Sequence, residues 1–76
     1  MGKKIVLYPN LIAELARGGV TITRLAKSLN LSRNALYRKL DGTTTFTLKD
    51  MVAIQNFFND EVGGAFSLDY LFKNGD

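Results

Sequence analysis

The chain has 76 residues, of which 46% are hydrophobic, and a formal net charge of +3. A chain of this length forms one domain, and the absence of cysteine and histidine excludes disulfides and the usual zinc sites. Its apolar runs are shorter than the roughly 18 residues of a membrane span, and a protein without cysteine fits a reducing compartment, so we expect a cytoplasmic protein that does not enter membranes.

Residues 1–8 are predicted to form an N-terminal arm, because Lys4–Tyr8 has the composition of a strand but no partner strand is evident. A first helix is expected over residues 10–17. Asn10 is its predicted N-cap, and the Gly18-Gly19 pair supplies a left-handed stop.

The next two helices are joined by a very short turn. Thr21 is the predicted cap of a helix over residues 22–29, and Ser32 is the predicted cap of a helix over residues 33–40. Between them stands Asn30, the residue type that best tolerates the left-handed conformation after glycine. The turn is therefore expected to begin at Asn30.

The fourth helix has the clearest start signal in the chain. Thr47 and Asp50 have the spacing of a capping box, and Phe46 and Met51 that of a hydrophobic staple. The expected helix ends at about Phe58. Its predicted core stripe is Leu48, Met51, Ile54 and Phe58.

A loop over residues 59–66 is predicted to follow, and Ser67 is the predicted cap of a last short helix that contains Leu68, Leu71 and Phe72. Five short helices without a convincing strand predict an all-α domain over residues 9–73.

Residues 21–41 have the apolar pattern of a helix-turn-helix. Ala26 allows a close approach of the two helices, and Leu25, Leu29, Leu31 and Leu36 are expected to fill the wedge between them. An ordinary corner between two helices has the same pattern, so the spacing alone does not establish a binding motif.

Charge is distributed unevenly along the chain. Residues 17–49 contain seven basic residues and one acid, whereas residues 50–76 contain five acids and one base. This asymmetry favours a face for a polyanion such as nucleic acid. The alternative is a solvated surface on which the charges are unevenly spread by chance.

Side chains on the outer face of the third predicted helix are suited to reading bases, because Arg pairs with guanine and Asn with adenine in bidentate fashion. The candidate base-reading residues are Arg33, Asn34, Tyr37 and Arg38. The candidate phosphate contacts are Thr21, Thr23, Arg24, Lys27, Ser32, Thr43 and Thr44. Asp41 argues against this interpretation, and a basic solvent-exposed helix is the alternative.

The stretches "YPNLIAELARGGVTITRLAKSLNLSRNALYRKLDG", "FTLKDMVAIQNFF" and "SLDYLF" resemble the lambda-repressor-like (XRE/Cro) helix-turn-helix family over Tyr8–Phe72. The resemblance implies a five-helix fold and a phage or prophage-type transcription regulator, a repressor that binds double-stranded DNA as a homodimer. The chain departs from the family pattern at Ile22, where Gln is common, and at Asn30, where Gly is commoner.

The sequence also bears on two other classes of function. An antirepressor or adaptor that keeps the fold would bind another protein, with Phe57–Phe66 as its surface. An enzyme is the weakest class, because no histidine, cysteine, carboxylate pair or phosphate-binding glycine loop is evident. We therefore expect no catalytic residues, no cofactor, no metal and no small-molecule substrate.

Overall fold

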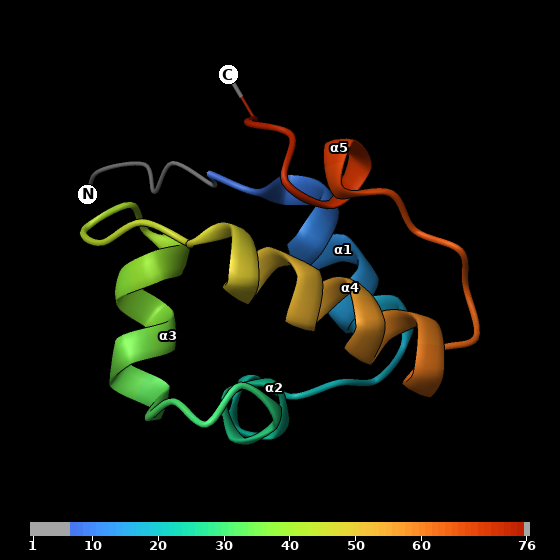
Figure 1. Cartoon of the computed structure of the whole chain (residues 1–76), viewed down its shortest axis with the longest axis horizontal. Helices are drawn as coiled ribbons and strands as arrows, with labels where there is room; N and C mark the ends of the chain where they lie inside the picture. The colour runs from blue at the N-terminus through green and yellow to red at the C-terminus, as the bar shows by residue number, and fades with distance from the viewer. Residues whose placement is uncertain (1–6, 76) are drawn as a thin grey trace.

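The computed structural model of the chain describes residues 7–75, which form five helices (Figure 1). The helices are α1 (Pro9–Arg17), α2 (Ile22–Ser28), α3 (Arg33–Leu40), α4 (Leu48–Glu61) and α5 (Leu68–Leu71). The described residues contain no strand, so the prediction of an all-α domain is confirmed. No helix in this part of the chain has both the length and the apolar character needed to cross a membrane.

Four helices begin at the residues that the sequence predicts. The N-caps are Thr21, Ser32, Thr47 and Ser67, and the hydroxyl oxygen of each accepts a hydrogen bond from the backbone N–H three residues later. Such a bond satisfies one of the amide groups that a helix start leaves without a partner. Asp50 completes the capping box of α4, because its carboxylate accepts a hydrogen bond from the Thr47 N–H.

The prediction for the start of α1 is wrong. The helix begins at Pro9, and Tyr8 precedes it without a side-chain cap. Proline suits this first position because the N–H that it lacks has no partner inside a helix. Asn10 therefore lies within α1, and its side-chain Nδ2 donates to the backbone oxygen of Tyr70, 2.9 Å away.

Two expectations for α4 are also wrong. The helix continues to Glu61, three residues beyond Phe58, so residues 59–61 are helical and do not belong to a loop. A left-handed stop is available only at Gly63, where φ is 79°. Leu48 is not part of the core stripe, because 68% of its surface is exposed in the first turn of the helix.

The core lies where the five helices meet. It contains Leu11, Leu15, Val20, Leu25, Ala26, Leu36, Phe46, Ile54, Phe58 and Leu71. Some contacts join helices that are not consecutive in the sequence. α4 contacts α2 as well as α5, and α5 also contacts α1. Figure 1 shows α4 crossing the middle of the molecule, with α2 and α3 at one side and α5 at the other.

An aromatic trio of Tyr8, Phe46 and Phe72 joins three distant segments. The ring centroids are 5.3 to 5.7 Å apart and the rings meet edge to face, a preferred arrangement of aromatic pairs. The backbone N–H of Gly75 also donates to the oxygen of Leu7 at 3.1 Å. The end of the predicted arm therefore packs on the domain, while residues 1–6 of that arm lie outside the described residues.

Candidate nucleic-acid interface

The turn between α2 and α3 has the hydrogen bonds of a Schellman motif. Asn30 has a φ of 60°, and no other described residue except glycine has a positive φ. The Leu31 N–H donates to the Ala26 oxygen at 2.9 Å, and the Asn30 N–H donates to the Lys27 oxygen at 3.1 Å. These bonds satisfy the last carbonyls of α2. The predicted left-handed turn at Asn30 is confirmed.

The two helices cross steeply because the turn is short and their contact is closely packed. In Figure 1 α2 is seen end-on and α3 along its length. Leu25, Ala26 and Leu36 are buried at the contact, and Leu29 packs against the same core. Leu31 is only half-buried and does not belong to this cluster, so the predicted leucine wedge has one member fewer.

One side of α3 carries several of the predicted site residues together. A polar pocket of about 380 Å³ is lined by Ser32, Asn34, Ala35, Arg38, Lys39 and Thr44. Asn34 and Arg38 are one helical turn apart and exposed. The Thr44 N–H donates to the Arg38 backbone oxygen at 3.0 Å, which holds the threonine loop, residues 43–45, against the end of α3. Arg33 is exposed in the first turn of α3.

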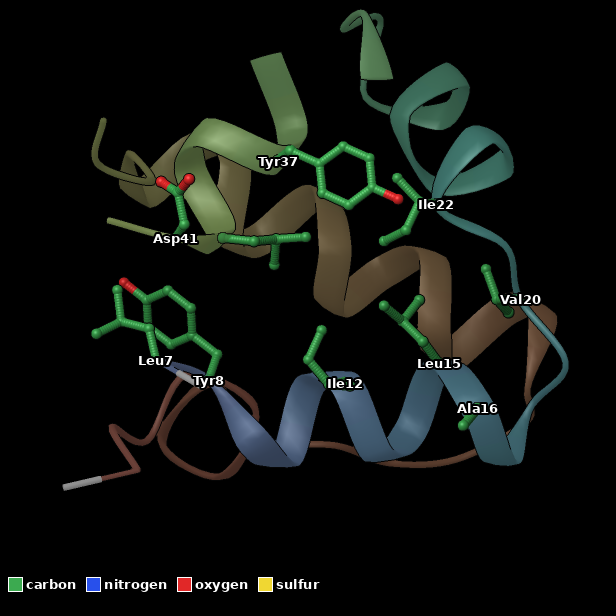
Figure 2. Close-up of a pocket in the computed structure, with 10 residues that line it drawn as sticks. Leu7, Tyr8, Ile12, Leu15, Ala16, Val20, Ile22, Tyr37 and Asp41 are labelled. Atoms are coloured by element: carbon green, nitrogen blue, oxygen red, sulfur yellow. The ribbon is translucent and has the colours of Figure 1, made fainter. Parts of the chain in front are cut away.

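Tyr37 lies apart from Asn34 and Arg38. It lines the apolar pocket, a hollow of about 670 Å³ between α1, the start of α2 and the end of α3. Figure 2 shows the Tyr37 ring next to Ile22 and above α1, so the ring extends over apolar side chains. Ile22 is half-buried there, which gives a packing reason for an apolar residue at a position where the resembled family often has Gln.

Three of the described cations are held by acids. Arg24 pairs with Glu61 and lies over the Phe57 ring. The Lys39 ammonium is 3.0 Å from an Asp50 oxygen, and the Arg17 guanidinium is 2.9 Å from a Glu14 oxygen.

Three others are exposed on the α2–α3 unit and form no ion pair with any described residue. These are Lys27, Arg33 and Arg38. A cation without an acidic partner keeps its charge and its donors available to an incoming anion. Of the cations predicted to contact DNA, Arg24 is therefore the one already engaged within the fold.

The predicted hydroxyl contacts divide in a similar way. The Thr43 hydroxyl donates to an Asp41 oxygen at 2.6 Å, and the Thr43 N–H donates to the same oxygen at 2.9 Å. Thr21 and Ser32 accept the capping bonds through their oxygens, so each hydroxyl proton remains available as a donor. Thr23 and Thr44 are exposed. Asp41 thus closes the turn after α3, a role that its position in the sequence did not reveal.

The apolar surface predicted at residues 57–66 is mostly occupied by its own rings. Phe58 is buried, and it contacts both Phe57 and Phe66 edge to face, with centroids 5.9 and 5.8 Å away. The exposed apolar residues of α4 are instead Leu48 and Val52, one helical turn apart. Sequence periodicity missed them because it placed Leu48 in the core.

Sequence reasoning also missed the role of Lys39. Its ammonium donates to the Thr45 backbone oxygen at 3.1 Å and also pairs with Asp50. Ten residues lie between Lys39 and Asp50, a spacing that no local pattern connects. Among residues 7–75, no group of three or more acidic, imidazole or thiol side chains is placed to hold a metal ion.

Comparisons with known proteins do not assign a family. No model of a protein family matches the chain, and no curated protein sequence and no solved structure matches it significantly. Function is therefore inferred from the geometry of the α2–α3 unit.

Proposed function

We propose that the chain is a sequence-specific double-stranded DNA-binding domain of the lambda-repressor-like helix-turn-helix type, and that α3 reads the major groove. The observation that carries this proposal is the set of exposed cations on the α2–α3 unit. Lys27, Arg33 and Arg38 have no acidic partner among the described residues, whereas Arg17, Arg24 and Lys39 do. A charge face of this kind is typical of polyanion binding.

The shape of the α2–α3 unit supports the proposal. A major groove about 12 Å wide admits one α-helix. In a helix-turn-helix protein the second helix of the unit enters the groove, and its first turn contacts base edges. Arg33 and Asn34 lie in the first turn of α3, and Arg38 follows Asn34 after one turn. Arginine discriminates guanine and asparagine discriminates adenine through bidentate hydrogen bonds.

The geometry sharpens the division of roles. We assign base contacts to Arg33, Asn34 and Arg38, which are exposed on α3. Phosphate contacts are assigned to the exposed side chains around them, namely Thr21, Thr23, Lys27, Ser32 and Thr44. Tyr37, Arg24 and Thr43 take supporting positions, because each is directed toward a partner within the domain.

A single α3 covers too few base pairs for high specificity, so we propose that the protein binds as a homodimer. Two-fold related domains then recognise half-sites about 34–36 Å apart, which is one turn of DNA. Occupation of such an operator is how a phage or prophage-type repressor would block transcription.

The test is selection of bound duplexes from a random pool, followed by titration of the enriched sequence. We expect a palindromic motif and an affinity at least about 1,000-fold above that for random DNA. The logarithm of the binding constant should fall by about 0.9 per phosphate contact for each log unit of salt. Equal affinity for enriched and random duplexes, with no salt dependence, would contradict the proposal.

One observation favours a second candidate, a protein-interaction module. Leu48 and Val52 expose 68% and 38% of their surfaces side by side on α4, and exposed apolar groups of this kind occur at protein interfaces. Under this alternative, a partner complex survives the Arg33→Ala/Asn34→Ala/Arg38→Ala variant and is lost when Leu48 and Val52 are replaced by Gln. Under DNA binding, the sensitivities are reversed.

A further inference from the structure

Lys39 differs from the other basic residues of α3 in its surroundings. Only 16% of its side chain is exposed. Its Nζ donates to the Thr45 backbone oxygen at 3.1 Å and lies 3.0 Å from an Asp50 oxygen. The same atom is 6.0 Å from the centre of the Phe46 ring. One ammonium thus contacts the threonine loop, the residue after that loop, and the first turn of α4.

The acid that pairs with Lys39 is itself firmly placed. The Asp50 oxygen that faces Lys39 also accepts a hydrogen bond from the Thr47 N–H, so one atom joins α3 to the capping box of α4. Burial on its own raises the pKa of the Asp50 carboxyl. Hydrogen bonds from Thr47 and Lys39 outweigh that effect and lower the pKa below its ordinary value of 3.8. The carboxylate is therefore charged at neutral pH.

The threonine loop is held at both ends by residues of the α3 region. Thr43 is bonded to Asp41, Thr44 donates its N–H to the Arg38 oxygen, and Thr45 accepts from Lys39. Thr44 therefore lies in the polar pocket with Asn34 and Arg38. The Lys39–Asp50 pair closes this arrangement from the α4 side.

We propose that Lys39 is a positioning residue for DNA recognition, which fixes the threonine loop beside α3 through Thr45 and Asp50 and does not itself contact DNA. The inference rests on the proposed DNA-binding function. The contacts of Lys39 with Thr45 and Asp50 would place the Thr44 hydroxyl and the Arg38 guanidinium on one surface. Without the ammonium, the loop keeps its turn at Asp41 but loses the side-chain link from Thr45 through Lys39 to Asp50.

Lys39→Met is the first test, because methionine keeps an apolar stem over Phe46 and removes only the ammonium. We expect specific DNA affinity to fall about tenfold with the salt slope unchanged. Lys27→Met is the matched comparison, since an exposed lysine that contacts phosphate should lower the slope by about 0.9. A slope that falls equally in Lys39→Met would make Lys39 a phosphate contact and overturn the inference.

Asp50→Asn is the second test. It changes the net charge in the opposite direction to Lys39→Met. The amide oxygen still accepts from the Thr47 N–H, while the protein gains one net positive charge, which by itself strengthens DNA binding. We expect weaker specific binding, and an effect that does not add to that of Lys39→Met, because both variants break the same pair. Stronger binding by Asp50→Asn would overturn the inference.

Amide hydrogen exchange in free protein separates this inference from the proposed function. The Thr44 N–H should exchange faster in Lys39→Met than in wild type, and Lys39→Arg should restore protection because arginine can reach the same acceptors. If wild type does not bind DNA, the proposed function fails while the exchange result still reports whether Lys39 holds the loop. Unchanged exchange at Thr44 contradicts the positioning role whether or not DNA binds.

Discussion

The same residue types perform different tasks in two regions of this molecule. On α1 and α5, Asn10, Arg17 and Tyr70 all bond within the fold: Asn10 donates to the Tyr70 backbone, and Arg17 and the Tyr70 hydroxyl donate to Glu14. Glu14 is only 2% exposed, and its second oxygen has no hydrogen-bond partner among the described residues. The buried acid thus fixes Arg17 and Tyr70, whereas a backbone oxygen fixes Asn10.

On α3 an asparagine, a tyrosine and an arginine lie within one stretch of the same helix, and no acid among the described residues is buried beside them. Asn34 and Arg38 are exposed, and Tyr37 lies over the apolar pocket. Composition therefore does not separate structural from solvent-exposed polar residues in a small helical domain. The two sets differ in whether the side chain has a hydrogen-bond partner among the described residues.

The variant Arg33→Ala/Asn34→Ala/Arg38→Ala should have the largest effect and should show the contrast most directly. Each base contact contributes about 1–3 kcal/mol, so specific affinity should fall at least about 100-fold, as measured by fluorescence anisotropy at fixed salt. The melting temperature should hardly change, because exposed substitutions cost within about 0.5 kcal/mol. Asn10→Ala is the control from the other region and should lower stability without weakening binding.

Asn30→Val should have the next largest effect, through the turn that sets the direction of α3. A β-branched residue at φ 60° costs about 1–2 kcal/mol of unfolding free energy, measurable by urea titration. Asn30→Gly adopts that conformation freely and should match wild type or exceed it slightly. Equal stability of the two variants would mean that the turn is not left-handed in solution.

Tyr70→Phe should have a smaller effect, lowering the melting temperature by a few degrees near neutral pH. The variant keeps the ring stacked on Phe66 and removes the donor to Glu14. That hydrogen bond raises the pKa of Tyr70 above its ordinary value of 10.0. Because the folded-state pKa is raised, the stabilisation is complete below pH 10.0 and is lost as the pH rises through the folded-state pKa.

The difference between wild type and Tyr70→Phe should therefore shrink in alkaline solution, which thermal melts over a pH series can follow. Tyr37→Phe is the matched control, since the Tyr37 hydroxyl has no hydrogen-bond partner among the described residues. A constant difference at every pH would argue against the Tyr70–Glu14 bond.

Leu48→Gln should have the smallest effect on stability, within about 0.5 kcal/mol, because the side chain is mostly exposed. Ile54→Ala on the same helix removes a fully buried side chain and should cost about 2–5 kcal/mol. Chemical denaturation compares the two. A large loss of unfolding free energy in Leu48→Gln would indicate that Leu48 is a core residue, as the sequence pattern predicts.

Features fixed by neighbouring residues could be predicted from the sequence. Thr21, Ser32, Thr47 and Ser67 cap their helices through bonds that span three residues, and Asn30 ends α2 through bonds that span at most five. Local patterns contain all the information that such features need.

Features fixed by distant residues could not be predicted. Asn10 bonds to a carbonyl 60 residues away, and Glu14 meets a hydroxyl 56 residues away, so neither partner has a local signal. Helix periodicity places Tyr37 in the base-reading group, but the ring covers an apolar pocket that α1 and the start of α2 help to line. Exposed side chains on α3 could be anticipated, whereas the engagement of Arg24 and Lys39 with α4 required the tertiary structure.

The placement of the three tyrosines has a practical consequence for spectroscopy. The chain has no tryptophan, and each tyrosine lies in a different environment: Tyr8 in the aromatic trio, Tyr37 over the apolar pocket and Tyr70 beside Glu14. Ring signals in a nuclear magnetic resonance spectrum should therefore report three regions separately. The Tyr8 signal should report the packing of the aromatic trio, the Tyr37 signal the position of α3, and the Tyr70 signal the surroundings of Glu14. No added label is needed.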